Sequence, residues 1–157
     1  MRIWGIVGRK NAGKTTLTER LVAELTARGL AVSTMKHTHH SVDIEVPGTD
    51  THRHRAAGAR QVLLASDARV TLMEELRVPV PFDALVARLA PCDVVLAEGW
   101  KHGTHDRIEV WRTACDGPPF AGEDPAIRAV ATDAVVSVGC HVLDLSDVGA
   151  VADFLLR

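Results

Sequence analysis

A glycine-bounded pattern near the N-terminus carries the strongest chemical signal in the sequence. The segment Gly8-Arg9-Lys10-Asn11-Ala12-Gly13-Lys14-Thr15 fits G-x-x-x-x-G-K-[ST] in full. Gly8 and Gly13 permit backbone angles that a side chain would obstruct, so successive N–H groups can surround an anion. We expect Lys14 to reach the β- and γ-phosphates, Thr15 to bind Mg²⁺, and Thr16 to lie beside the loop. The pattern predicts a nucleoside triphosphate or another polyphosphate, but neither the base nor the reaction.

An acidic residue at the end of a predicted strand is the second signal. The apolar run 93–97 leads into Glu98, which is followed by Gly99. Ligands of open α/β sheets bind beyond the carboxyl ends of the strands, so we expect Glu98 beside the phosphate loop. There it could hold Mg²⁺ through a water molecule or orient an attacking water, and the alternative is a solvated loop acid. Lys14 and Glu98 are the predicted catalytic residues.

A polar, histidine-rich stretch spans residues 37–54 and leaves three hypotheses open. Its histidines are His37, His39, His40, His52 and His54. They could form a transition-metal site, because imidazole suits Zn²⁺, Ni²⁺ and Cu²⁺, or they could simply face solvent. In the third hypothesis the stretch contacts an anion, with Lys36 and Asp43 near the triphosphate and Arg53 and Arg55 as cationic clamps. Asp43 is then a further predicted metal ligand, together with Thr15 and Glu98.

Base recognition is weakly indicated. The guanine motif N-K-x-D is absent, but Ala131-Thr132-Asp133 ends a late predicted strand. Asp133 there could accept hydrogen bonds from guanine N1–H and the 2-amino group. A turn-forming aspartate is the alternative.

Apolar and amphipathic segments alternate along the chain, as in α/β proteins. Strands are predicted at 3–7, 30–35, 61–65, 70–74, 93–97, 108–111, 129–131 and 142–145, and helices at 15–28, 51–57, 83–89 and 148–156. A loop is predicted at 116–125, where prolines and glycines are frequent. We expect one domain over residues 1–157, a P-loop NTPase-type, mostly parallel sheet flanked by helices. An exposed sheet edge near 61–74 could pair across a dimer.

Composition narrows the class of protein further. The chain has 157 residues, 18 Lys and Arg against 20 Asp and Glu, and a formal net charge of -2, which excludes an obvious nucleic-acid binder. Its 46% of hydrophobic residues excludes a disordered protein. Three dispersed cysteines favour a reducing compartment, and neither a leader nor a membrane span is predicted. We therefore expect a cytoplasmic protein that contacts neither nucleic acid nor membrane.

Four segments together resemble the MobB family of molybdopterin-guanine dinucleotide biosynthesis adapter proteins. They read GRKNAGKTTL, KHTHHSVDIEVPGTDTHRHRAAGA, DVVLAEGWK and RIEVWR, and they extend from residue 8 to residue 112. The phosphate loop alone is unspecific, whereas the segment 43–59 is much more specific. Ala12 departs from the serine found in many relatives, which should matter little because backbone N–H groups surround the phosphate.

The resemblance implies a dimeric, metabolic GTPase of the P-loop type that binds GTP and Mg²⁺ and hydrolyses GTP slowly. It also implies an accessory role beside MobA, the guanylyltransferase that joins molybdopterin to GMP. By the match to the motif, Gly8 to Thr16 bind phosphate and Glu98 is the acid of the second nucleotide motif. The histidine-rich stretch corresponds to a loop that faces a ligand or a partner. A small-molecule kinase and a metal-delivery GTPase are the alternative functions.

Overall fold

The computed structural model describes residues 1–38 and 42–157. The contacts divide the chain into two compact units, the first formed by 1–38 and 88–157 and the second by 39–87. The single domain expected from the chain length stays a prediction. His39 and His40, which the metal hypothesis uses, lie outside the described residues.

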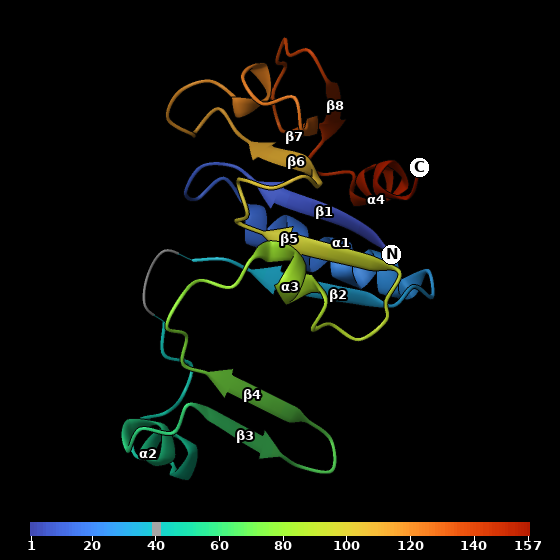
Figure 1. Ribbon diagram of the computed structural model, residues 1–157. Helices are drawn as coiled ribbons and strands as arrows, with labels where there is room; N and C mark the ends of the chain where they lie inside the picture. Colours follow the sequence, from blue (N-terminus) through green and yellow to red (C-terminus); the bar gives the residue numbers. More distant parts are fainter. Residues whose placement is uncertain (39–41) are drawn as a thin grey trace. The chain divides into compact units, whose positions relative to one another are not determined.

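The first unit is built on a six-stranded sheet in which every neighbouring pair is parallel. Its strands are β1 (Arg2–Val7), β2 (Val32–Lys36), β5 (Val94–Glu98), β6 (Asp106–Trp111), β7 (Ile127–Thr132) and β8 (His141–Asp144). They lie in the order β2-β5-β1-β6-β7-β8 (Figure 1). The expectation of an α/β fold with a mostly parallel sheet is confirmed.

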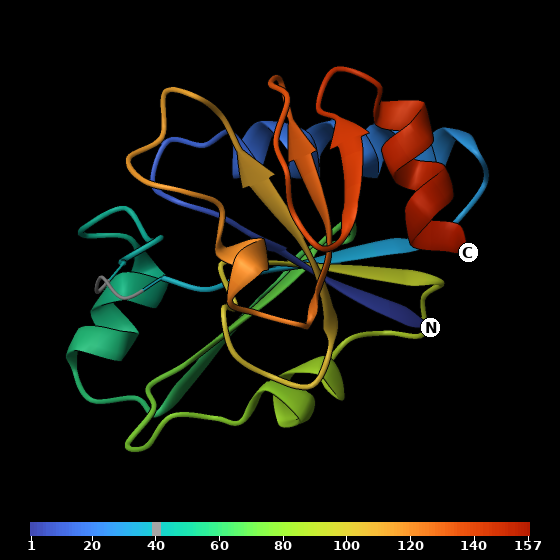
Figure 2. The same ribbon diagram turned by 90° about the horizontal axis from the view of Figure 1, so that it is seen from above.

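Two helices cover one face of this sheet. Figure 2 shows α1 (Lys14–Ala27) and α4 (Val148–Leu156) on the same side of the strands. Leu17, Leu21 and Leu25 form the buried apolar stripe of α1. The buried residues of α4 that join the same core are Val151, Ala152 and Leu155. Every residue of β5 is buried, as expected for a central parallel strand with both faces covered. This packing fixes the strand ends from which the phosphate loop and Glu98 emerge.

The opposite face of β6 carries two buried charges, and the predicted loop at 116–125 provides their partners. Glu109 accepts hydrogen bonds from the backbone N–H groups of Phe120 and Ala121, both at 2.9 Å. Arg107 pairs with Asp124 at 3.0 Å. Burial raises the pKa of Glu109, and the two backbone donors act in the opposite direction. The loop, which includes the short 3-10 helix η1 (Phe120–Gly122), is thereby held against the sheet.

The second unit contains α2 (Asp50–Ala56), the antiparallel hairpin of β3 (Gln61–Ala65) and β4 (Val70–Glu74), and α3 (Phe82–Val86). Both hairpin strands have the predicted bounds. The helix α3 ends at Val86 rather than at the predicted Leu89. No glycine or asparagine follows the apolar residues there to mark the end of a helix. The spacing of the apolar residues therefore predicted which face of the helix is apolar, but not the residue at which the helix ends.

The described helices are short compared with a bilayer. The longest, α1, has 14 residues, whereas a spanning helix needs about 20. Among the described residues, no helix is long and apolar enough to cross a membrane.

Candidate functional site

The phosphate loop connects β1 to α1 and is shaped by three residues with positive φ. Gly8 has φ 140°, Asn11 63° and Gly13 100°. At Gly8 a Cβ atom would lie 2.3 Å from the carbonyl oxygen of Val110, so glycine is required there. Asn11 adopts the left-handed conformation that asparagine tolerates, which the sequence interpretation did not anticipate. Gly13 directly precedes α1 and has no side chain to cap the first turn, so the N–H groups of that turn remain suited to an anion.

The side chain of Lys14, which is expected to bind phosphate, folds back over the phosphate loop. Its Nζ donates to the carbonyl oxygens of Gly8 at 3.1 Å and Arg9 at 2.6 Å. Burial lowers the pKa of Lys14, with Glu98 opposing that shift and Lys36 adding to it. A partly desolvated ammonium group surrounded by other cations would be stabilised by a polyanion. An incoming phosphate would take the place of the two carbonyl partners.

Thr15, Glu98 and Lys36 meet at the carboxyl edge of the sheet. Thr15 Oγ1 donates to Glu98 Oε1 at 2.9 Å, and Lys36 Nζ forms an ion pair with the same carboxylate oxygen. Glu98 is only 5% exposed. The parallel register explains the meeting, because Glu98 of β5 is opposite Ile6 of β1 on one side and Lys36 of β2 on the other. The structure therefore brings Glu98 beside the phosphate loop.

The oxygen donors of this edge fit Mg²⁺ better than a transition metal. A hydroxyl and one carboxylate are ligands that Mg²⁺ accepts alongside phosphate oxygens and water. Among residues 1–38 and 42–157, no group of three or more His, Cys, Asp or Glu side chains could hold a metal ion. Thr15 and Glu98 would hold the magnesium ion, which would neutralise phosphate charge there.

A cavity of about 460 Å³ lies over the loop and collects most of the predicted residues. It is lined by Lys10, Asn11, Gly13, Lys14, Thr15, Thr16, Lys36 and Glu98. Ala12 is buried and does not line the cavity. The side chain of Arg9 turns elsewhere, donating to the carbonyl of Pro118 at 3.2 Å and lying over the ring of Phe120 at 4.6 Å. Lys36 also lines the cavity, although only one of the three hypotheses for the histidine-rich stretch placed it near the phosphates.

Asp133 follows β7 at the same edge of the sheet and has a cationic neighbour. Its Oδ2 lies 3.6 Å from Nε of Arg112, the residue that follows β6. A Cβ atom on Gly13 would lie 3.9 Å from that same Nε, so Arg112 stands between the phosphate loop and Asp133. A cavity of about 310 Å³ adjoins Asp133. Motif reasoning missed Arg112, and only the strand order could have indicated it.

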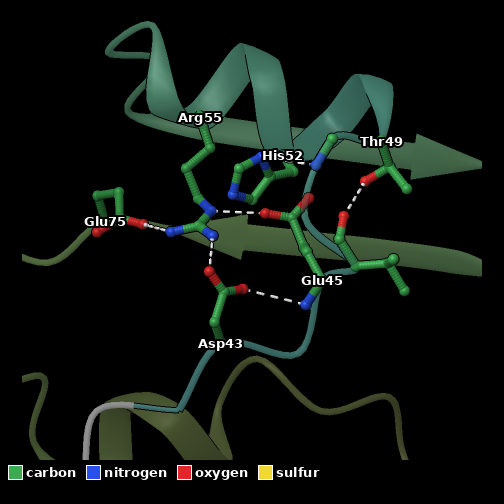
Figure 3. Close-up of polar contacts among 8 residues, drawn as sticks. Asp43, Glu45, Thr49, His52, Arg55 and Glu75 are labelled. Carbon is green, nitrogen blue, oxygen red and sulfur yellow. Dashed lines mark hydrogen bonds and ion pairs between the residues drawn. The ribbon is translucent and has the colours of Figure 1, made fainter.

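In the second unit, Arg55 of α2 is surrounded by three carboxylates (Figure 3). Its guanidinium donates to Glu45 at 2.6 Å and to Glu75 at 3.1 Å, and it also pairs with Asp43. Asp43 in addition accepts the backbone N–H of Glu45 at 3.0 Å. Arg55 is thus already neutralised, which disfavours its predicted role as an anion clamp. The metal role of Asp43 stays a prediction, since its carboxylate here pairs with Arg55, while Thr15 and Glu98 belong to the first unit.

The carboxylates around Arg55 make the second unit sensitive to acid. A backbone hydrogen bond from Glu45, followed by Arg55, lowers the pKa of Asp43, and hydrogen bonds from Thr51 and Arg55 lower that of Glu45. Lowered carboxyl pKa values stabilise the folded form above the ordinary value of about 4, and this stabilisation is lost as the pH falls through the lowered values. We expect hydrogen-exchange protection of α2 and β3 to fall below about pH 4.

The variant Arg55→Gln should remove most of that pH dependence, because the carboxylates lose their shared cation. Arg53→Gln, on the exposed side of the same helix, is the matched control and should behave as the unaltered protein does. The same acid response in all three proteins would contradict a role for Arg55 in holding the cluster.

The fold and the loop geometry together define a P-loop NTPase-like α/β protein. The sequence profile of the family described as "MobB: Molybdopterin guanine dinucleotide synthesis protein B" matches residues 3–133. The chain therefore belongs to the MobB family.

Individual relatives agree with this assignment. The molybdopterin-guanine dinucleotide biosynthesis adapter protein of Haemophilus influenzae is 37% identical over 153 residues, covering 96% of this chain and 85% of the relative. The Escherichia coli protein of the same name is 36% identical over 153 residues, covering 92% of this chain and 86% of the relative. Among solved structures, a MobB homolog from Bacillus stearothermophilus has a TM-score of 0.70 at 27% identity, covering 99% of this chain and 96% of its own. The structure of a molybdopterin-guanine biosynthesis protein B has a TM-score of 0.76 at 26% identity, covering 98% of this chain and 97% of its own.

Proposed function

We propose that this chain is a GTP-binding adapter in molybdopterin guanine dinucleotide biosynthesis, which assists the guanylyltransferase MobA and hydrolyses GTP slowly with Mg²⁺. The observation that carries the nucleotide part is the convergence of Lys14, Thr15 and Glu98 on one cavity at the start of α1. Family membership and the names of the adapter relatives support the biosynthetic part.

The proposal assigns tasks to the loop backbone and to three side chains of the cavity, those of Lys14, Thr15 and Glu98. The loop N–H groups and Lys14 would bind the β- and γ-phosphates, and Thr15 and Glu98 would hold Mg²⁺. Oε1 of Glu98 already accepts from Thr15 and pairs with Lys36, so it is engaged rather than directed at a water molecule. Slow hydrolysis is the expected consequence. Asp133, which follows β7 and lines the separate cavity of about 310 Å³, is the proposed guanine contact.

The variant Glu98→Gln is expected to lower GTP hydrolysis and to keep GTP affinity within about tenfold, or ~1.4 kcal/mol. Glutamine preserves the size of the side chain and can still accept from Thr15, but it removes the charge that would hold Mg²⁺. Phosphate release under single-turnover conditions measures the effect. Glu123→Gln, which alters an exposed acid directly after η1, is the control and should leave hydrolysis unchanged. Normal hydrolysis by Glu98→Gln would reduce Glu98 to a structural residue.

The adapter role is tested by binding to immobilised MobA, measured by biolayer interferometry with and without GTP and Mg²⁺. We expect a complex that is strengthened by the nucleotide, and no nucleotide effect with Lys14→Ala. Absence of a complex in every condition would remove the adapter role while leaving the nucleotide site untouched.

A homodimer that uses the hairpin is part of the proposal. Leu63 of β3 and Leu72 of β4 are directly opposite each other in the register and are 61% and 53% exposed. Exposed apolar patches of this kind commonly mark contact surfaces. Leu72→Lys should shift the mass measured by light scattering from dimer to monomer, whereas Thr71→Lys, on the other face of β4, should not. A dimeric Leu72→Lys protein would exclude this surface.

A small-molecule kinase remains the second candidate because of one observation. A cavity of about 360 Å³, lined in part by Val22 and Met35, shares Thr15, Lys36 and Glu98 with the phosphate cavity. It offers room for an acceptor beside the terminal phosphate. ADP or GDP release that depends on an added hydroxyl compound would favour this function over the adapter.

A further inference from the structure

A second cavity, of about 590 Å³, opens at the sheet edge opposite the phosphate loop. It is lined by Trp4, Ala121, Gly122, Pro125, Ile127, Arg128, Gly139, Cys140, His141, Phe154 and Arg157. These residues come from β1, from the starts of β7 and β8, from the end of α4 and from the loops at 121–125 and 139–140. Its volume lies in the range of about 300–1,000 Å³ that small-molecule sites occupy. None of the residues assigned above to the nucleotide lines it.

Three rings form a connected aromatic wall in this cavity. The ring centroids of Trp4 and Phe154 are 5.7 Å apart, and those of His141 and Phe154 are 5.1 Å apart. Both pairs are tilted, within the separations at which rings attract each other. The indole Nε1 of Trp4 donates to the carbonyl of Leu155 at 3.0 Å, which fixes the ring against α4. The wall is therefore formed before any ligand arrives.

The charged side chains that line this cavity are cationic. Arg128 and Arg157 belong to the wall, and the guanidinium of Arg157 lies 5.9 Å from the centroid of Phe154. Within the described part of the chain, no acidic side chain lines the cavity; Asp106 pairs with Arg128 from outside it at 3.2 Å. Burial raises the pKa of Cys140, so its thiol remains neutral and does not repel an anion.

We propose that this cavity binds a flat aromatic or heteroaromatic molecule that carries a phosphate or a similar anionic group. The ring system stacks on the wall of Trp4, His141 and Phe154. The anionic group binds the guanidinium groups of Arg128 and Arg157, which match phosphate geometry with paired donors. Because the phosphate loop lies at the other edge of the sheet, the two sites can be occupied independently.

Flavin mononucleotide and riboflavin provide a matched pair of probes, since they share one fluorescent ring system and differ by a phosphate. Titration of the full chain should quench the fluorescence of flavin mononucleotide through contact with Trp4 and reach saturation. Riboflavin should bind at least about tenfold more weakly, a loss of ~1.4 kcal/mol. Equal binding of the two probes, or binding of neither, would overturn the proposal.

Two variants locate the bound probe. Arg128→Gln should reduce the affinity for flavin mononucleotide toward that of riboflavin, whereas Arg69→Gln on the β3–β4 turn should not. Trp4→Phe should diminish the quenching even where binding persists. Unchanged affinity of Arg128→Gln, with its fold verified by circular dichroism, would exclude the cavity.

The variant Lys14→Ala separates this inference from the proposed function. It should bind flavin mononucleotide normally, because Lys14 belongs to the phosphate cavity at the other edge. Loss of the probe in Lys14→Ala would show that flavin mononucleotide occupies the nucleotide site, and the proposal would fail. A chain that binds flavin mononucleotide but not GTP would instead reject the proposed function alone.

Discussion

Replacing Lys14 by alanine is expected to weaken GTP binding about a hundredfold, or ~2.7 kcal/mol, while the protein stays folded. Lys14 is the cation whose Nζ lies over the loop carbonyls of Gly8 and Arg9, at the position that phosphate oxygens would take. Burial already lowers the pKa of Lys14, so its charge is incompletely solvated and gains strongly from a polyanion. Calorimetric titration with GTP in the presence of Mg²⁺ measures the loss.

Lys10→Ala is the matched control for Lys14→Ala. Lys10 belongs to the same loop and lines the same cavity, but its side chain is exposed. Its removal changes the net charge equally and keeps the backbone N–H groups, so we expect a loss of at most about threefold, ~0.7 kcal/mol. Equal losses in both variants would mean that general charge, rather than the position of Lys14, controls binding.

Replacing Gly8 by alanine should destabilise the fold more than any other single change discussed above, by about 3 kcal/mol or more. The alanine Cβ would lie 2.3 Å from the carbonyl oxygen of Val110, which is a backbone atom of the central strand β6. The φ of 140° is also one that side chains rarely adopt. Either the loop or the β1–β6 pairing must move. Urea denaturation measures the change in the free energy of unfolding.

Gly29→Ala separates steric overlap from backbone conformation. Gly29 follows α1 with φ 81°, and a Cβ atom there would meet nothing within 4 Å. Only the left-handed conformation is then unfavourable, at about 1 kcal/mol. Losses of similar size at Gly8 and Gly29 would contradict the contact with Val110 as the reason for glycine in the phosphate loop.

The local features of this fold were predictable because local chemistry specifies them. The apolar run that ends at Gly8 and the leucine spacing of α1 predicted a strand, a loop and a helix in the observed order. The strands β3 and β4 and the helix α4 were predicted with the observed bounds. The position of Glu98 was predicted from a general property of parallel sheets, namely that ligands bind beyond their carboxyl ends.

The features that were not predictable depend on contacts between distant segments. Arg112 enters the surroundings of the phosphate loop only through the strand order, which no motif encodes. The same strand order is what favours, for Lys36, the hypothesis that placed it near the triphosphate. The carboxylates that pair with Arg55 come from Asp43 and Glu45, which precede α2 in the sequence, and from Glu75, which follows β4. The aromatic wall joins Trp4 at one end of the sequence to Phe154 at the other. Side-chain types indicated the chemistry in these places, but the tertiary fold decides which of them meet.

The central claim is a GTP site built on the phosphate loop, and calorimetric titration with GTP and ATP, each with and without Mg²⁺, tests it most directly. We expect GTP to bind with Mg²⁺ at least about tenfold more tightly than ATP, a difference of ~1.4 kcal/mol, with little turnover during the titration. Equal or tighter binding of ATP would contradict the GTP-dependent adapter and favour the kinase. Failure of both nucleotides to bind would contradict the nucleotide site itself.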